Sequence, residues 1–222
     1  KKKALPPLFR QGQFIVETPW WLKKLGPDCL WDMPQKEKKL YLSFDDGPHP
    51  VITPFILNEL RKYNAKATFF CIGENVMKYP DVYRQILEEG HVTGNHTQQH
   101  INGWKSADEI YLNDINQASV LIDSPLFRPP YGRISRSQIR KLIQEKGKGS
   151  REWQIVMWNI LAGDWVAELS PERCFDRITR KIRAGDIIVF HDSEKAWDRM
   201  SYCLPLLLEK YTNEGFQFEK IG

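Results

Sequence analysis

Two histidines that lie four residues apart, His96 and His100, could form a metal-chelating pair. On one helical turn, this spacing places both imidazoles on the same side. A carboxylate from another strand would complete a site of two histidines and one carboxylate. Such a site leaves positions open for water and substrate, as catalytic zinc and iron sites do. For the histidine pair alone, we favour the simpler interpretation of two solvent-facing or core histidines.

Two adjacent aspartates shift this balance toward a metal site. Asp45 and Asp46 follow an apolar run and precede Gly47-Pro48. Taken alone, Asp-Asp-Gly-Pro is an ordinary turn sequence, because Asp and Gly supply its backbone angles. Adjacent side chains in such a turn usually point in different directions, so the two carboxylates should not do the same job. One of them can bind a metal ion while the other accepts a proton.

Other ionisable residues also stand directly after short apolar runs. Arg128 precedes Pro-Pro and can pair with a carboxylate, although it could equally be a surface residue. His191 ends the apolar run 187–190 and is a reasonable general acid at the mouth of a barrel. Asp164, next to Trp165, is either a site residue or an ordinary loop acid. The remaining histidines are assigned structural or loop roles: His49 and His91.

The elements that must position these residues alternate short apolar runs with helical patterns from Lys39 onward. This alternation is typical of repeated βα units and a mainly parallel sheet. In such folds the carboxyl ends of the strands meet at one face, where functional residues gather. We therefore expect the residues above to lie together at one face of a single α/β barrel. Seven strands are predicted: Lys39–Phe44, Lys66–Ile72, His91–Gly94, Leu126–Arg128, Gln154–Ile160, Asp186–Phe190 and Phe216–Ile221.

Start and stop signals mark the helices between these strands. Helix starts are predicted at Thr53-Pro54, at the capping boxes Ser106–Glu109 and Ser135–Gln138, and at Ser170-Pro171. Gly90 and Gly215 mark helix ends.

Residues 1–38 are predicted to be an N-terminal extension of the catalytic domain, which spans residues 39–222. Thr18–Gly26 reads as a short helix with a threonine cap, and we expect its apolar side to cover one end of the barrel. Membrane docking through Trp20 and Trp21 is the less favoured alternative, because the helix is short for that role.

The composition excludes several classes of protein. With 41% hydrophobic and 27% charged residues, the 222-residue chain has the composition of a folded globular protein. Its net charge of +4 is too small and too evenly spread to indicate nucleic-acid binding. We see no apolar stretch long enough for a transmembrane segment and no signal-peptide core. The cysteines form no Cys-x-x-Cys pair and indicate neither a zinc knuckle nor a disulfide framework: Cys29, Cys71, Cys174 and Cys203.

Five ordered segments resemble the motifs of the polysaccharide deacetylases with a NodB homology domain, carbohydrate esterase family 4. They are residues 43–48, 96–100, 128–132, 164–165 and 189–191. The resemblance runs from Lys39 to the C-terminus and implies a distorted (β/α)7 barrel. It also implies a divalent metal ion, usually zinc, with cobalt, nickel and manganese as alternatives. The reaction implied is hydrolysis of N-acetyl, or sometimes O-acetyl, groups on a glycan.

The resemblance also implies a role for each matching residue. The metal ligands would be Asp46, His96 and His100. The catalytic residues would be Asp45 as general base, Arg128 holding Asp45, His191 as general acid and Asp164 tuning it. The substrate contacts would be the backbone amide of Tyr131, at the oxyanion, and Trp165, in the pocket wall. Two positions depart from the family pattern, which often has an acid where Leu161 stands and leucine where Val189 stands.

The expected substrate is an acetylated polysaccharide or oligosaccharide, with peptidoglycan or another N-acetylglucosamine glycan ahead of xylan. One alternative keeps the metal site but gives it a small amide or ureide substrate. A second is a non-catalytic carbohydrate-binding protein that stacks sugars on Tyr131, Trp165 and Trp197. No nucleic-acid partner is expected, and the oligomeric state stays open. The substrate class favours a location at the cell envelope or outside the cytoplasm, although the sequence shows no signal peptide.

Overall fold

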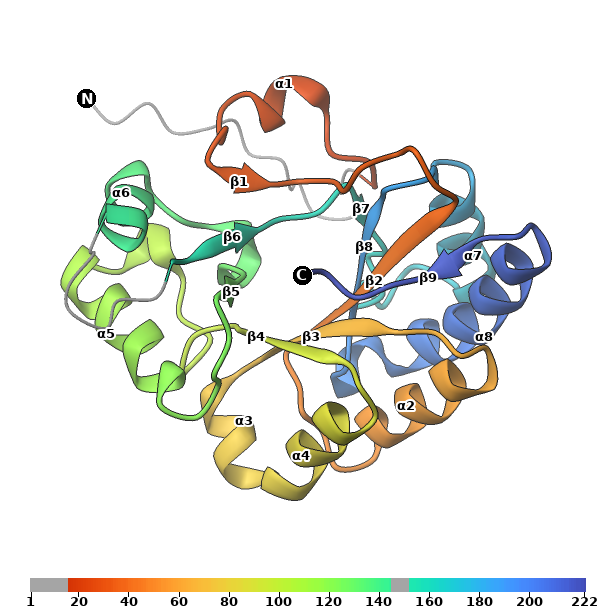
Figure 1. The fold of residues 1–222 in the computed structure, drawn as a ribbon, viewed down its shortest axis with the longest axis horizontal. Coiled ribbons are helices and arrows are strands. Elements are labelled where there is room, and N and C mark those ends of the chain that lie inside the picture. The colour runs from red at the N-terminus through yellow and green to blue at the C-terminus, as the bar shows by residue number, and fades with distance from the viewer. Residues whose placement is uncertain (1–15, 145–151) are drawn as a thin grey trace.

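A computed structural model describes residues 16–144 and 152–222, in which parallel strands curl into a ring with helices outside it (Figure 1). The hydrogen-bonded order around the ring is β1-β6-β5-β4-β3-β2-β8-β7, and β9 pairs with β2. The predicted distorted α/β barrel is therefore confirmed. The strands are β1 (Cys29–Leu30), β2 (Lys39–Asp45), β3 (Ala67–Cys71), β4 (Val92–Asn95), β5 (Leu126–Phe127), β6 (Gln154–Val156), β7 (Ile160–Leu161), β8 (Ile187–His191) and β9 (Gln217–Phe218).

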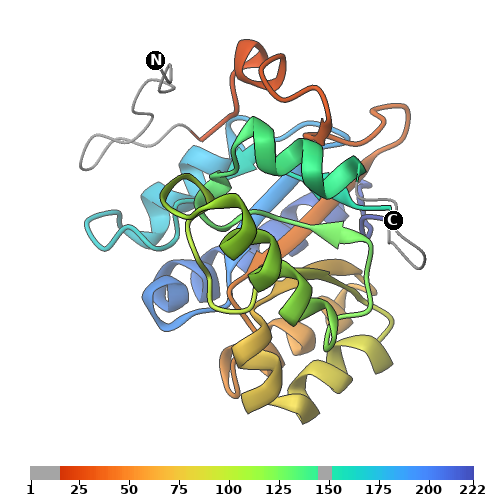
Figure 2. The ribbon, with the colours of Figure 1, turned by 90° about the vertical axis from the view of Figure 1, so that its left-hand side faces the viewer.

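The helices cover the outside of the ring, as the perpendicular view in Figure 2 also shows. They are α1 (Trp20–Lys23), α2 (Ile52–Lys62), α3 (Gly73–Lys78), α4 (Pro80–Glu88), α5 (Asp108–Ser119), α6 (Arg136–Gln144), α7 (Pro171–Thr179) and α8 (Trp197–Asn213). Among the residues described, no helix is both long and apolar enough to cross a membrane.

The capping signals succeed in two places and fail in three. Thr18 and Thr53 do not cap their helices, because α1 and α2 follow Pro19 and Val51 without a side-chain cap hydrogen bond. Ser135 and Gln138 form the predicted capping box, because each backbone N–H donates to the other's side chain, at 2.9 and 3.1 Å. Ser170 caps α7 by accepting from Arg173 N. The capping box predicted at Ser106 is wrong, since α5 follows Ala107 and the Ser106 hydroxyl instead donates to Asn102 O.

The predicted strand 154–160 is in fact two strands with different partners. Met157 N donates to Leu30 O in β1, whereas Asn159 N donates to Ile187 O at the start of β8. Residues 157–159 thus carry the chain from one edge of the sheet to the other. A continuous apolar run does not reveal such a change of partner, because both halves are buried.

The N-terminal segment lies across the gap between these two edges. Its strand β1, which was not predicted, pairs in parallel with β6. Glu17 forms an antiparallel bridge with Ile160, and Thr18 N donates to Asn159 O at 2.7 Å. Helix α1 is shorter than the predicted Thr18–Gly26, and none of its four residues is buried. The residues on either side of α1 therefore make the contacts with the sheet.

Alternation along β2 separates two cores. Leu40, Leu42 and Phe44 point outward into the large cluster beneath the helices. Tyr41 points inward to a second cluster, which lies inside the ring and includes Ile221. The backbone N–H of Ile221 donates to Thr68 Oγ1, near the start of β3, at 2.9 Å. The C-terminal residues therefore close the ring at the amino ends of the strands. Figure 1 accordingly shows the C-terminus near the middle of the ring.

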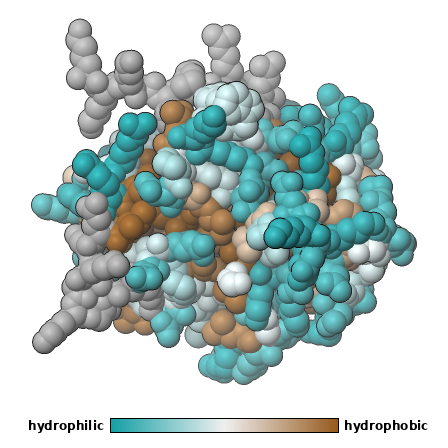
Figure 3. Space-filling view, turned by 45° about the horizontal axis from the view of Figure 1, so that its top comes forward, coloured by the Kyte–Doolittle hydropathy of each residue, from teal (hydrophilic) through white to brown (hydrophobic). Residues whose placement is uncertain are grey.

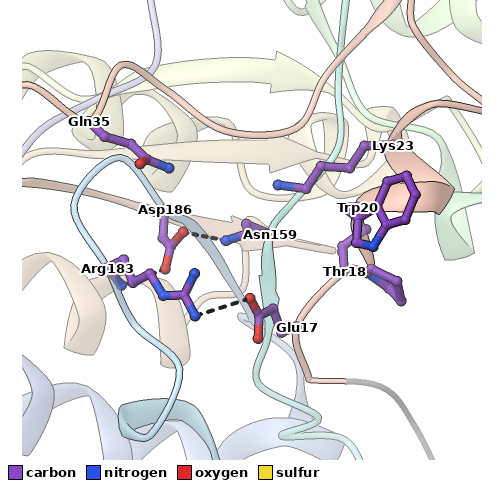
Figure 4. A pocket seen from close by; sticks show the side chains of 9 residues that line it. Glu17, Thr18, Trp20, Lys23, Gln35, Asn159, Arg183 and Asp186 are labelled. Carbon is purple, nitrogen blue, oxygen red and sulfur yellow. Dashed lines mark hydrogen bonds and ion pairs between the residues drawn. The ribbon is translucent and has the colours of Figure 1, made fainter.

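A cavity of about 490 Å³ lies at the same end of the barrel, beside α1 (Figure 4). Asn159 and Asp186, which line it, directly precede β7 and β8, so the cavity is at the amino ends of the strands. Asn159 Nδ2 donates to Asp186 Oδ1, and Arg183 pairs with Glu17 at 3.8 Å. The charged side chains Asp186, Arg183 and Glu17 that line the cavity thus contact other residues of the same lining. Figure 3 shows one face of the molecule, which is mostly hydrophilic with a group of apolar side chains exposed left of its centre.

Candidate metal and acid–base site

The carboxyl end of β2 directs its two aspartates to different places. Asp45 continues the inward series of Tyr41 and Ser43, so its side chain lies in the barrel interior and is only 4% exposed. The chain then turns at Asp46, whose φ of 86° ends the strand geometry. Because of this turn, adjacent residues face different surroundings, as the sequence predicted.

Asp46 and the two histidines converge. His100 Nε2 lies 3.2 Å from Asp46 Oδ1, and His96 Nε2 lies 3.8 Å from the same oxygen. One ligand atom from each residue falls within 4.8 Å of the others, and among the described residues no other set of histidine, cysteine and acidic side chains forms such a group. Two imidazoles and one carboxylate suit zinc and related divalent ions, so these residues fit the metal that the sequence predicts.

The segment that carries the histidines is a loop and not a helical turn. Residues 96–100 follow β4 without helical structure, so the geometric reason given for the spacing of four was wrong. Left-handed backbone at Thr97 (φ 66°) and His100 (φ 55°) brings the two rings to 5.1 Å instead. Asp114 Oδ2, on α5, holds the loop by accepting from the backbone N–H groups of Gln98 and Gln99 at 2.9 and 3.1 Å.

Hydrogen bonding sets the tautomer of His96. Its Nδ1 lies 2.7 Å from Arg128 O, and a carbonyl oxygen can only accept, so Nδ1 carries the proton. Burial lowers the pKa of His96 to about 4 despite the opposing charge of Asp45. The imidazole is therefore neutral at pH 7, and its unprotonated Nε2 faces Asp46. This is the form that a metal ligand requires.

The neighbouring histidines keep the Asp46 carboxylate ionised. Burial would raise the pKa of Asp46, but the hydrogen bond from His100 and the charges of the nearby histidines outweigh it and hold the pKa well below its usual range.

Arg128 pairs with Asp45 in the interior of the barrel, as the sequence suggested. The arginine is fully buried, and its Nη1 donates to Asp45 Oδ1 at 2.7 Å and to Ser43 Oγ at 2.8 Å. Its other nitrogens donate to Val156 O and Met157 O, and its guanidinium lies 4.0 Å from the Phe70 ring centroid. All three guanidinium nitrogens thus donate hydrogen bonds, which fixes the orientation of one carboxylate oxygen of Asp45.

His191 forms a second pair with the fully buried Asp164. Asp164 Oδ1 accepts from His191 Nδ1 at 2.8 Å, and Asp164 Oδ2 accepts from His191 N at 2.8 Å. Burial alone would lower the pKa of His191, but the charge and hydrogen bond of Asp164 outweigh it and raise the pKa to about 10. His191 is therefore protonated at neutral pH, with Nδ1 engaged and Nε2 carrying the other proton.

Aromatic side chains border both parts of the site. The Tyr131 ring lies 4.6 Å from that of His100, and the Trp165 ring lies 4.9 Å from that of His191. Tyr131 has φ 60° in the short 3₁₀ turn Pro130–Gly132 and is 55% exposed. Trp197 is elsewhere, packed edge-on against Phe55 at 5.1 Å, so it is not part of this site.

Asp192 supports the aspartate turn and was not predicted to have a role. Its Oδ1 accepts from Gly47 N at 2.7 Å, and its Oδ2 accepts from Thr53 Oγ1 at 2.6 Å. A Cβ at position 47 would lie 1.9 Å from Asp192 Oδ2, which explains the glycine. Burial raises the pKa of Asp192 to about 7, and the charge of Asp46 acts in the same direction. Adjacency to His191 was the only signal in the sequence.

A parallel α/β barrel with this metal-ligating group and two acid–base pairs at its strand ends defines a metal-dependent hydrolase. The chain belongs to the polysaccharide deacetylase family, whose pattern matches residues 32–148. It is 34% identical over 207 residues to a peptidoglycan-N-acetylglucosamine deacetylase of Bacillus cereus, covering 90% of this chain and 95% of the relative.

Two further comparisons agree. The chain is 35% identical over 165 residues to a chitooligosaccharide deacetylase of Azorhizobium caulinodans, covering 71% of this chain and 75% of the relative. Its fold matches the crystal structure of a peptidoglycan N-acetylglucosamine deacetylase in complex with an N-hydroxybenzamide derivative. The TM-score is 0.79 at 28% identity, over 92% of this chain and 95% of the other. The chain is therefore a polysaccharide deacetylase.

Proposed function

We propose that this enzyme removes the acetyl group from N-acetylglucosamine units of peptidoglycan. The observation that carries the proposal is the meeting of Asp46, His96 and His100 beside the Asp45–Arg128 and His191–Asp164 pairs. Relatives that act on peptidoglycan or chitooligosaccharide support N-acetylglucosamine as the sugar. With peptidoglycan as the substrate, we propose that the enzyme acts at the cell envelope.

Zinc is the proposed metal, and Asp46, His96 and His100 would hold it. When bound, it supplies Lewis acidity to the acetyl carbonyl and makes water easier to deprotonate. Cobalt, nickel and manganese accept the same donors and are expected to substitute.

Asp45 acts as the general base. Because Arg128 donates to its Oδ1, the carboxylate is fixed in the interior with Oδ2 left to accept the proton of the attacking water. Arg128 itself has no contact with solvent, so its role is to orient Asp45. A positioned general base contributes about 10²- to 10⁴-fold in rate.

His191 acts as the general acid. Asp164 occupies Nδ1, so the proton available for transfer is the one on Nε2, which goes to the departing amine nitrogen as the carbon–nitrogen bond breaks. The products are acetate and a free amino sugar. The backbone N–H of Tyr131 donates to the oxyanion of the tetrahedral intermediate, and Trp165 forms the wall beside His191.

We also propose that residues 39–222 form the catalytic domain and that residues 16–38 complete its sheet. The pairing of β1 with β6 and the bridge from Glu17 to Ile160 support this division.

The test of the proposed function is acetate release, measured with and without a chelator. The substrates would be peptidoglycan, chitooligosaccharides, acetylxylan and small amides. We expect release from the N-acetylglucosamine glycans, loss of activity with the chelator, and recovery when zinc is restored. Activity confined to small amides, or no activity on any of these substrates, would contradict the proposal.

A further inference from the structure

Three side chains extend from the metal-ligating group along the surface, and we call them the Tyr–Arg–Trp row: Tyr131, Arg133 and Trp104. The row starts at His100, whose ring lies 4.6 Å from that of Tyr131. The Arg133 guanidinium follows, 5.8 Å from the Tyr131 ring and 5.4 Å from the Trp104 ring. Tyr131 and Trp104 are 55% and 48% exposed. The row therefore presents two accessible aromatic faces with a cation between them.

The outer end of the row is held rigidly although it is exposed. Trp104 Nε1 donates to Ile134 O at 3.0 Å, and Gln138 Nε2 donates to Gly103 O at 2.9 Å. The two loops touch so closely that a Cβ at Gly103 would lie 2.4 Å from Arg133 O. The Trp104 ring is thus fixed in place before any ligand binds, which lowers the entropy cost of stacking on it.

The charge of Arg133 is available to a ligand. Within residues 16–144 and 152–222, no carboxylate forms an ion pair with its guanidinium, which instead lies against the two aromatic rings. Arg128 also lies against aromatic rings, but it is fully buried and paired with Asp45. Guanidinium groups that stack on aromatic rings keep their edges free for a carboxylate, which they bind through two parallel N–H···O hydrogen bonds.

We propose that the Tyr–Arg–Trp row is a glycan-binding subsite that selects a sugar carrying its own carboxylate next to the acetylated unit at the metal. Tyr131 and Trp104 stack on the apolar faces of sugar rings, and Arg133 binds the carboxylate. This inference rests on the proposed function and adds to it a preference for an acidic glycan over a neutral one. In peptidoglycan, the lactyl carboxylate of N-acetylmuramic acid provides such a group.

The experiment compares kinetics on three glycans of equal length. The first is a neutral chitooligosaccharide, the second alternates N-acetylglucosamine with N-acetylmuramic acid bearing a free carboxylate, and the third carries stem peptides on that carboxylate. For Arg133→Gln we expect kcat/KM on the second glycan to fall about tenfold relative to the first, mainly through KM, because a charged hydrogen bond is lost. Arg136→Gln, an exposed arginine at the start of α6, is the control with the same change of charge.

Trp104 provides an independent measurement of stacking. We expect Trp104→Ala to raise KM on both peptide-free glycans about tenfold with kcat little changed, and Trp104→Phe to restore most of the affinity. The subsite proposal is overturned if Arg133→Gln affects the neutral and acidic glycans alike, if it matches Arg136→Gln, or if only the peptide-bearing glycan responds. Failure of the unaltered enzyme to deacetylate any of the three would contradict the proposed function instead.

Discussion

The two ends of the barrel are built from opposite kinds of residue. At the carboxyl end of the strands, the interior holds buried ionisable side chains, among them Asp45, Arg128 and Asp164. At the amino end, the interior holds the apolar cluster around Ile221. At the neighbouring cavity, Glu17 pairs with Arg183 near the surface, and the buried Asp186 is held by hydrogen bonds from Asn159 and from the backbone N–H of Arg183. The comparison indicates that one end is organised for chemistry and the other for closing the fold.

The backbone shows the same contrast. Five described residues other than glycine have positive φ, and four of them lie at the carboxyl end of the strands: Asp46, Thr97, His100 and Tyr131. Asn64, the exception, follows α2. Left-handed backbone is unfavourable for most side chains and persists where surrounding contacts over-determine it. Asp114 provides such contacts for the loop that contains Thr97 and His100, and Asp192 provides one beside Asp46.

The largest expected effect is at the metal-ligating group. His96→Ala removes one of the three proposed ligands, and we expect loss of bound metal and a fall in kcat/KM of about 10³-fold or more. Elemental analysis and acetate release measure the two effects. His49→Ala is the matched control, because His49 caps the start of α2 and lies outside the group. Equal metal content in the two variants would remove His96 from the ligand set.

The next largest effect is expected at His191, the proposed general acid. Asp164→Asn removes the charge that raises the pKa of His191 to about 10, so the alkaline limb of the rate profile should move to lower pH. The raised pKa also stabilises the fold. This stabilisation is complete below the unfolded pKa of 6.5 and is lost as pH rises through about 10. The pH profile of kcat measures the first effect, and the pH profile of the unfolding free energy measures the second. If the alkaline limb of the kcat profile did not move in Asp164→Asn, His191 would be excluded as the general acid.

At the amino end, a substitution should change stability and leave catalysis intact. Ile221 is fully buried, so Ile221→Ala should lower the free energy of unfolding by about 2–4 kcal/mol, while kcat/KM of the folded enzyme is unchanged. Ile221→Val, with a smaller cavity, should cost about 1 kcal/mol. Denaturant unfolding and acetate release test this separation. A parallel loss of activity in the folded Ile221→Ala protein would show that the two ends are coupled.

The smallest effect is expected at the cavity. Glu17 pairs with Lys181 at 3.5 Å and with Arg183 at 3.8 Å, and both basic residues are more than half exposed. Solvent screens such pairs, so Glu17→Gln should change the free energy of unfolding by less than about 1 kcal/mol. A change of several kcal/mol in denaturant unfolding would mean that this cavity matters more to the fold than the comparison allows.

The sequence was sufficient to predict the residues at the strand ends because parallel βα units bring those ends together. Asp45, Asp46, Arg128 and His191 all lie where that rule places them. The loop geometry at His96 was beyond the sequence, since it depends on left-handed residues and on hydrogen bonds to α5.

Other features depended on distant partners. The pairing of β1 with β6 joins residues more than a hundred positions apart, and the change of partner at 157–159 takes the chain from Leu30 in β1 to Ile187 in β8. Asp192 was overlooked because its role depends on the backbone of Gly47 and on Thr53, which only the fold brings near it.

The most direct test of the account is a parallel measurement on Asp45→Asn and Asp46→Asn, with metal content and acetate release determined for each. We expect Asp45→Asn to keep one metal ion per chain and lose about 10²- to 10⁴-fold in turnover, because it removes only the proposed base. Asp46→Asn should lose the metal ion and turnover together. Retention of metal by Asp46→Asn, or its loss from Asp45→Asn, would contradict the assignment of ligand and base to these two neighbours.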